Sequence, residues 1–375
     1  MTHASMLRRA RRKGNLSSAL NTTERVTLLF TLMTQLFLDP RVEDHFVEYD
    51  MSAVLATPAD GSERDLRRRV LEDYVGEKVI LLRNCRIDYD QAFVNTLRFP
   101  QTWSYKKFDS AVMEDTSPLR QNPTKQAICS EVCGGDKGKY RKFESELRCI
   151  NAGIRRITDS LLAGYGVRQK AIIWRHTETR LENLHVDIDQ DSENIESVRL
   201  YFNMDDVPRI WHTTHPFSRL IRHYYRALDL AAFADQPLEQ LLKSVSLRLF
   251  GTWRTRGRER FPHHVAMFEP GDFWLSDGRT VPHQVVYGRR TVSTFYRLDQ
   301  SRLPPWHPSL VERVRALHGA LRAADDLGES AALAGVPEPY GPAGPPLPPT
   351  TRKVSLKAEW ERHALESVQP TLVRL

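Results

Sequence analysis

The stretch Leu184-His185-Val186-Asp187-Ile188 alternates apolar and polar residues and is the most informative part of this 375-residue chain. A period of two is typical of a β-strand, in which successive side chains point to opposite faces. His185 and Asp187 would then share one face and offer an imidazole and a carboxylate to the same ion. The H-x-D pattern also arises by chance, and the alternative is an ordinary surface ion pair.

A third ligand is expected from His283, which lies far along the chain in Pro282-His283-Gln284 and precedes a predicted pair of strands. Two histidines and one carboxylate on one face of a metal form the facial triad of non-haem iron(II) oxygenases, which leaves coordination positions open. We therefore predict His185, Asp187 and His283 as metal-binding and catalytic residues. The alternative for His283 is a loop residue without a special role.

The residue pattern on both sides of this motif predicts many short strands and several helices. Strands are expected over residues 79–82, 170–174, 184–188, 198–202, 264–268, 273–276, 285–287 and 291–296. Helices are expected over residues 23–38, 64–76, 88–98, 141–165, 216–232 and 237–250, and the polar stretch 100–140 is expected to be rich in loops. Short strands separated by turns are typical of an antiparallel sandwich or barrel. We expect a mostly β protein with flanking α-helices.

Composition excludes several other classes of protein. The 54 Lys and Arg outweigh the 47 Asp and Glu by a net charge of only +7, and the basic residues are not interleaved with aromatic ones. We therefore expect no nucleic-acid partner. The four cysteines are too few for a disulfide scaffold, and Cys129 and Cys133 lack the second pair that a zinc site needs. A cytoplasmic protein with reduced thiols is the simplest interpretation.

The order of these residues resembles the Fe(II)/2-oxoglutarate-dependent dioxygenases and, among them, the Kdo hydroxylases, which modify the 3-deoxy-octulosonic acid sugar of lipopolysaccharide. Beyond the three metal ligands, the resemblance is carried by Trp174-Arg175, Arg199-Leu-Tyr-Phe-Asn203, Pro208-Arg-Ile-Trp211, Pro216-Phe217, Phe268-Glu-Pro-Gly271 with Trp274, and Thr294-Phe-Tyr296. It covers roughly residues 140–300. It implies a double-stranded β-helix, which is a jelly-roll, cupin-like fold, and an enzyme that uses Fe(II), 2-oxoglutarate and O2.

The resemblance implies hydroxylation of an unactivated C–H bond of a small molecule or sugar, coupled to decarboxylation of 2-oxoglutarate to succinate. Kdo is one candidate substrate. The acidic loop over residues 190–196 departs from the family pattern, so an amino-acid-derived or other natural product is an alternative. Desaturation and cyclisation also stay open. An alternative of another class is a non-catalytic, cupin-like binding module.

The far carboxylate of 2-oxoglutarate needs a buried cation, and arginine offers a bidentate fork. The resemblance points first to Arg199 and Arg209, then to Arg290 and finally to Arg297; the alternative for each is a surface position. Trp211 follows Arg209 by two residues and is expected to line the same cofactor pocket. Two further histidine pairs, His212 with His215 and His263 with His264, are interpreted as polar turns rather than as a second metal site.

The chain is expected to divide into three parts. These are a basic flexible arm over residues 1–20, a single dioxygenase domain over 21–325 with its jelly-roll core at about 165–300, and a Pro-rich extension over 326–375. The apolar run over residues 26–38 is too short to span a membrane. The arm, with five Lys or Arg in residues 8–13, is either a free tail or a peripheral contact with an anionic surface such as the inner membrane. The oligomeric state is left open.

Overall fold

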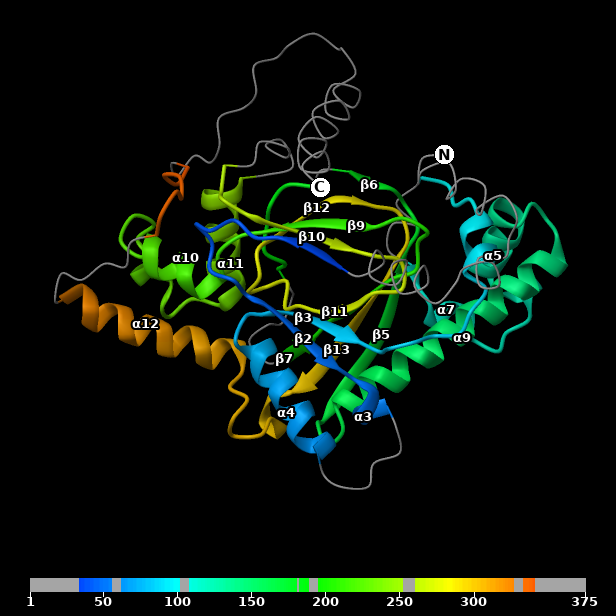
Figure 1. Ribbon diagram of the computed structural model, residues 1–375, viewed down its shortest axis with the longest axis horizontal. Coiled ribbons are helices and arrows are strands. Elements are labelled where there is room, and N and C mark those ends of the chain that lie inside the picture. The colour runs from blue at the N-terminus through cyan, green and yellow to red at the C-terminus, as the bar shows by residue number, and fades with distance from the viewer. Residues whose placement is uncertain are drawn as a thin grey trace, which may run out of the picture.

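Two β-sheets lie face to face at the centre of the computed structural model, and helices pack around them (Figure 1). The structure describes residues 34–55, 62–101, 108–180, 182–188, 195–251, 260–326 and 333–340. The smaller sheet has the strand order β1 (Gln35–Phe37), β10 (His264–Phe268), β9 (Arg209–Thr213), β12 (His283–Gly288) and β6 (Thr179–Arg180). All its strand pairs are antiparallel.

The larger sheet joins distant parts of the chain. Its order is β2 (Phe46–Asp50), β3 (Val79–Arg83), β11 (Phe273–Leu275), β8 (Leu200–Asn203), β13 (Thr291–Asp299), β5 (Val167–Arg175) and β4 (Phe108–Asp109), and β7 (Ile195–Val198) also pairs with β13. Only the pairing of β2 with β3 is parallel among these described strands. The long strand β13 therefore holds together segments that are far apart in sequence.

The space between the sheets is filled by aromatic and aliphatic side chains. Tyr201 and Trp274 come from the larger sheet, and Trp211 and Phe268 come from the smaller one. Trp274 stacks on Phe268 with ring centroids 3.9 Å apart and on Tyr201 with centroids 5.3 Å apart. Because side chains alternate along a strand, this interior face also carries the polar residues of the candidate site.

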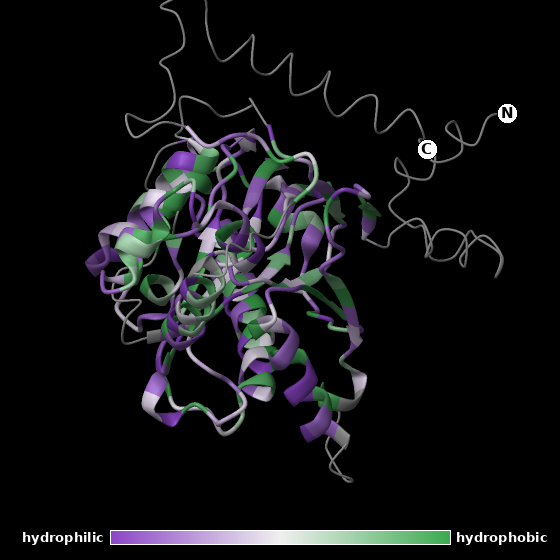
Figure 2. Ribbon diagram, turned by 90° about the vertical axis from the view of Figure 1, so that its left-hand side faces the viewer, coloured by the Kyte–Doolittle hydropathy of each residue, from purple (hydrophilic) through white to green (hydrophobic). Residues whose placement is uncertain are grey.

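Helices cover the outer face of the larger sheet. They include α3 (Ser52–Leu55), α4 (Ser62–Val75), α5 (Gln91–Thr96), α7 (Ala111–Glu114), α8 (Pro123–Ala127) and α9 (Lys137–Leu161). The side chain of Asp136 caps α9 by accepting from the N–H groups of Gly138 and Lys139. Residues at helical spacing, such as Phe143, Leu147 and Ile154, are fully buried. Figure 2 shows hydrophilic and hydrophobic residues along the helices, as expected where one side faces a core.

A second group of helices packs at the opposite end of the molecule (Figure 1). It contains α10 (Phe217–Tyr224), α11 (Leu238–Val245) and α12 (Leu310–Asp326), together with a short π-helix over Ser246–Phe250. Leu184 and Val186 of the H-x-D segment are buried in this helical cluster. The helices therefore support that segment from the side opposite to His185 and Asp187.

Part of the Pro-rich extension, residues 333–340, packs against the same helical cluster. The Tyr340 N–H donates to the carbonyl of Arg248 at 2.7 Å, and the Tyr224 hydroxyl donates to the carbonyl of Pro337 at 2.5 Å. The guanidinium of Arg260 lies 4.0 Å from the centroid of the Tyr340 ring. The basic arm over residues 1–20 and the rest of the extension lie outside the described residues.

Three sequence-based expectations are wrong in the described residues. Residues 35–37, expected in a helix over 23–38, form β1, while residues 23–33 are not described. Residues 184–188, expected as a strand, make only an isolated bridge between His185 and His283. The segment 100–140, expected to be rich in loops, is instead helical over much of its described length: it contains α7, α8, the start of α9 and a π-helix over Ile128–Val132.

Most of the remaining expected elements are present with similar bounds. The helix expected over 216–232 ends at Tyr224, and a turn and a short 3-10 helix over Leu230–Phe233 follow it. Among the described helices, none combines the length and hydropathy required to cross a bilayer.

Candidate metal centre

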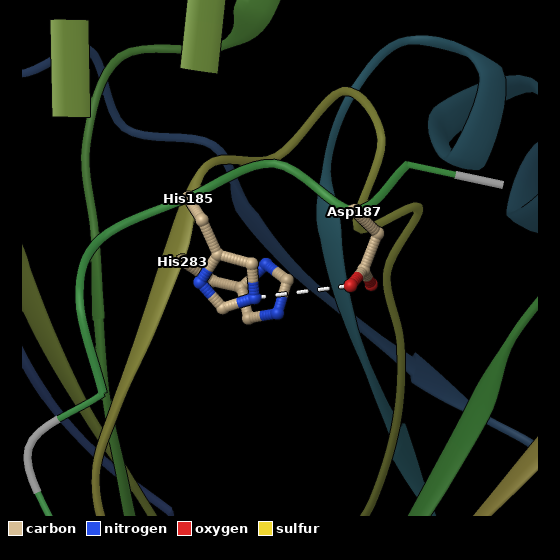
Figure 3. Close-up of side chains that lie close together, drawn as sticks. All are labelled: His185, Asp187 and His283. Carbon is tan, nitrogen blue, oxygen red and sulfur yellow. Dashed lines mark ion pairs between the residues drawn. The ribbon is translucent and has the colours of Figure 1, made fainter. Parts of the chain in front are cut away.

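His185, Asp187 and His283 meet at one end of the interior between the sheets (Figure 3). One ligand atom from each lies within 4.8 Å of the others. The backbone brings them together: the His185 N–H donates to the carbonyl of His283 at 3.1 Å, and the His283 N–H donates back at 2.9 Å. His283 begins β12, so the smaller sheet fixes the position to which the H-x-D segment is joined.

Both histidines are oriented in the same way. Nδ1 of His185 lies 2.8 Å from the carbonyl oxygen of Asn183, and Nδ1 of His283 lies 3.1 Å from the carbonyl oxygen of Val281. A carbonyl can only accept, so each Nδ1–H donates to its carbonyl and Nε2 is the nitrogen left for a metal. This is the arrangement in which backbone partners fix the tautomer of histidine ligands.

Burial and, to a smaller extent, the neighbouring His185 lower the pKa of His283 to about 4 against the opposing charge of Asp187. His283 is therefore neutral near pH 7, which a metal ligand requires. Trp211 stacks on its ring with centroids 4.9 Å apart and planes inclined by 22°. The indole holds the imidazole in place and covers it from water.

The carboxylate of Asp187 is held from two sides. Its backbone N–H donates to the carbonyl of Gly278 at 2.7 Å, and its Oδ2 pairs with the guanidinium of Arg199. Oδ1 faces the Nε2 of His185 at 3.8 Å. Burial alone would raise the pKa of this carboxyl, but the positive charge of Arg199, together with smaller contributions from His283, His185 and Arg175, outweighs burial and holds the pKa well below its usual range. Asp187 is therefore ionised.

Arg209 is a buried cation on the interior face of β9. Its side chain is 4% exposed, and no described carboxylate forms an ion pair with it. Burial and, to a smaller extent, the charge of Arg175 lower the pKa of its guanidinium to about 10. Its Nε has no hydrogen-bond partner. A guanidinium kept charged in such a place is suited to bind an organic anion.

The other arginines singled out from the sequence have different surroundings. Arg199 contacts Asp187 and lies 4.0 Å from the centroid of the Phe295 ring. Arg290 donates to Asp205 at 3.0 Å and to the carbonyl of Leu97 at 3.1 Å. These contacts join separate segments of the chain and stabilise the fold. Arg297 is half-buried on β13. These contacts leave Arg209 as the strongest candidate for an anion clamp.

Three residues that border the site are not among the site residues expected from the sequence. Gly278 lies directly behind Asp187, and Gly288 lies beside Arg209. Arg175 is half-buried on β5, and its charge lowers the pKa of both Asp187 and Arg209. The stretch Trp174-Arg175 carries part of the family resemblance, so the sequence does contain a signal that points to Arg175. The two glycines give no signal without the fold.

The remaining histidine pairs do not form a second metal cluster within the part of the chain that the structure describes. His212 stacks on His263 with ring centroids 3.9 Å apart. His264 accepts the N–H of Asp39 at 2.9 Å through Nδ1, and His215 is buried. They are structural side chains of the smaller sheet and its flanking turn.

Solved structures with a similar fold come from a Kdo hydroxylase, KdoO, described as a non-haem Fe(II) α-ketoglutarate-dependent dioxygenase. Its complex with succinate and Fe(III) aligns with a TM-score of 0.51 and 14% identity, covering 74% of this chain and 96% of that one. Its complex with cobalt(II) aligns with a TM-score of 0.50 and 13% identity, covering 78% and 99%. The expected jelly-roll fold with flanking helices is thereby confirmed.

Comparison with protein-family models finds no match, and no curated protein is similar in sequence.

Proposed function

We propose that this chain is a non-haem iron(II) enzyme that uses 2-oxoglutarate and O2 to hydroxylate a C–H bond of a small molecule, with release of succinate and CO2. One observation carries the proposal. Two imidazole nitrogens and one ionised carboxylate converge in the interior between the sheets, and the same interior also contains the buried Arg209, which pairs with no described carboxylate. The fold shared with KdoO agrees with this assignment.

The donor set fits iron(II). Two histidines and one carboxylate are the ligands of the facial triad, and that set leaves open positions for further ligands. Both Nδ1 atoms are bonded to backbone carbonyls, so both Nε2 atoms remain for a metal, and Asp187 keeps one oxygen for it while Arg199 binds the other. His185, Asp187 and His283 would hold the ion, which when bound supplies the activation of dioxygen.

Arg209 would bind the far carboxylate of 2-oxoglutarate. Arg209 and Trp211 are alternate residues of β9 and share its interior face, and Trp211 stacks on His283. Alternate residues on a strand are about 7 Å apart, which is close to the length of a five-carbon dicarboxylate. The aromatic side chains of Tyr201, Trp274 and Phe268 fill the interior beside this path and exclude water from it.

The substrate that we propose is a small sugar acid such as Kdo. The fold shared with a Kdo hydroxylase supports it, and so does the charge of Arg175, which forms no ion pair with any carboxylate of the described residues. The polar loop that suggested a different substrate lies mostly outside the described residues, since 189–194 are not described. We place the reaction in the cytoplasm, because all four cysteines are free.

The experiment measures succinate formed from 2-oxoglutarate by the purified protein with added Fe(II) and O2, first without any substrate. We expect slow uncoupled turnover in the wild type and none in His185→Ala or Asp187→Ala. His263→Ala, whose ring lies outside the cluster, is the control and keeps wild-type turnover. A wild type that binds neither Fe(II) nor 2-oxoglutarate would instead identify a non-catalytic, cupin-like module. Kdo-containing lipopolysaccharide fragments then test the substrate through an increase in succinate.

A further inference from the structure

The turn between β11 and β12 places a glycine against two of the three candidate ligands. Gly278 accepts the backbone N–H of Asp187 at 2.7 Å. A Cβ at this position would lie 3.0 Å from Cγ of Asp187 and 3.0 Å from Cε1 of His283, and closer still to Oδ2 of Asp187. The carboxylate therefore occupies the space that any side chain at position 278 would fill.

A charge network of the buried residues Glu196, Asp277 and Arg279 and the half-buried Arg313 holds this turn. The Arg279 guanidinium donates to Oδ1 of Asp277 at 2.9 Å, to Oδ2 of Asp277 at 2.8 Å and to Oε1 of Glu196 at 2.5 Å. Nη2 of Arg313 lies 3.9 Å from Glu196 and 4.0 Å from Asp277, so two guanidinium groups face two carboxylates. Removing any one member would leave an uncompensated buried charge, which is costly. The intact network therefore stabilises one arrangement of the turn.

The network also connects the turn to the helical cluster. Oε2 of Glu196 accepts the N–H of Leu310 at 2.7 Å, at the first residue of α12. The backbone N–H of Arg279 donates to Oδ1 of Asp277 at 3.0 Å, and the N–H groups of Thr280 and Val281 donate to the Asp277 carbonyl. The turn is thus fixed on both sides of Gly278. A clash at that position must be relieved by the Asp187 carboxylate rather than by the backbone.

We propose that Gly278 positions Asp187 as a ligand through a single oxygen, and that the charge network of Glu196, Asp277, Arg279 and Arg313 keeps Gly278 there. Arg199 binds Oδ2 from one side, and the bare α-carbon of Gly278 lies against the same oxygen. Oδ1 is then the oxygen directed towards the two imidazoles. This inference rests on the proposed metal-binding role of the three residues.

The test is an anaerobic titration with cobalt(II), without 2-oxoglutarate, followed by the visible absorption of the bound ion. Gly278→Ala is expected to raise the cobalt dissociation constant by about 10–100-fold and to change the band shape, because residues that orient ligands have effects of that size. Gly319→Ala is the matched control, since a Cβ at position 319 of α12 meets no atom within 4 Å. It should leave both the affinity and the spectrum unchanged.

The outcomes separate the two proposals. A wild type that does not bind cobalt contradicts the proposed function itself. A wild type that binds cobalt while Gly278→Ala binds it equally, with the same spectrum, overturns the positioning role. A purely structural role would lower the melting temperature of the metal-free protein without altering the cobalt spectrum.

If Gly278→Ala does not fold, Asp277→Asn gives the answer, because it keeps the shape of the side chain and removes its charge from the network. We expect weaker cobalt binding with an altered spectrum. Wild-type binding by this variant would refute the role of the network.

Discussion

At the level of single residues, the H-x-D pattern and the distal histidine identify the side chains that meet in space. The pattern succeeds because residue type and spacing are enough to suggest a ligand set. It fails for Gly278 and Gly288, whose importance depends on which side chains pack against them in three dimensions. It also ranks Arg199 with Arg209, and only the ion pair with Asp187 separates the two.

The assignment of Arg209 predicts a specific loss of co-substrate affinity. Arg209→Lys replaces a planar fork with a single ammonium, and we expect the dissociation constant of 2-oxoglutarate to rise about 10–100-fold, since such a change costs roughly 1.4–2.7 kcal/mol. Anaerobic calorimetry with the cobalt-loaded protein measures it. Arg168→Lys, at an exposed ion pair with Asp299, is the control. Unchanged affinity in Arg209→Lys would exclude this residue as the clamp.

Gly288 offers a test that mirrors the one at Gly278. A Cβ at position 288 would collide with the guanidinium of Arg209 and lie 3.0 Å from its Cγ. We expect Gly288→Ala to weaken binding of 2-oxoglutarate while the cobalt affinity stays at its wild-type value, because no ligand atom is displaced. Equal weakening of both affinities would show that the substitution disturbs the whole interior rather than Arg209.

At the level of elements, the segment 184–188 shows how a pattern can be right about faces and wrong about structure. Its alternation separates His185 and Asp187 from Leu184 and Val186, as expected for a strand. The segment pairs only once, with His283, because its other neighbours are helices rather than strands. Alternation reports which side is apolar, and it does not report whether the apolar side meets a sheet or a helix.

This packing predicts unequal effects of two neighbouring substitutions. Leu184 is 3% exposed in the helical cluster, so Leu184→Ala should lower the free energy of unfolding by about 2–5 kcal/mol. Ile188 is 39% exposed, and Ile188→Ala should change it by less than about 0.5 kcal/mol. Urea unfolding of both variants is the measurement. Similar losses in the two would mean that the helices do not support the segment.

Other mismatches also arise from tertiary contacts and local caps. Residues 35–37 pair with β10 at the edge of the smaller sheet, and this pairing overrides their helical periodicity. In the polar segment before α9, Asn122 caps α8 by accepting the N–H of Lys125 at 3.1 Å. Polar residues there begin short helices instead of forming loops, which a count of polar residues cannot reveal.

At the level of the whole molecule, several buried histidines make stability depend on pH. Burial lowers the pKa of His45 to about 4, of His176 to about 3 and of His307 to about 4. Below the ordinary pKa of 6.5, the unfolded chain binds protons that the folded protein does not, so stability falls as the pH decreases from 6.5 towards 4. Each such histidine contributes about 1.4 kcal/mol per pH unit.

His176 allows this to be tested one residue at a time. Its ring stacks on Phe99 at 3.6 Å between centroids, and neither ring nitrogen has a hydrogen-bond partner. His176→Phe removes one group that binds a proton in the unfolded chain but not in the folded protein. The free energy of unfolding should therefore fall less steeply as the pH decreases from 6.5 to 4. Urea unfolding at several pH values gives the slope. Identical slopes for wild type and variant would contradict the buried, neutral state of His176.

The sequence predicted most elements of this fold but not how they are arranged. The strands over residues 170–174 and 291–296 are both visible in the pattern, yet their pairing as β5 and β13 depends on contacts between residues far apart in the chain. The same holds for the parallel pairing of β2 with β3 and for the packing of residues 333–340 on the helical cluster. Non-local contacts of this kind leave no periodic signal.

The stacking of Trp211 on His283 gives the protein a built-in optical probe. An indole stacked on the His283 ring lies close to any ion that this ring holds, and its buried position keeps it away from quenchers in the solvent. Binding of a paramagnetic ion should therefore quench the intrinsic tryptophan fluorescence, and Trp211→Phe should remove most of that quenching. Occupancy of the centre can then be followed in real time without a dye, a label or turnover.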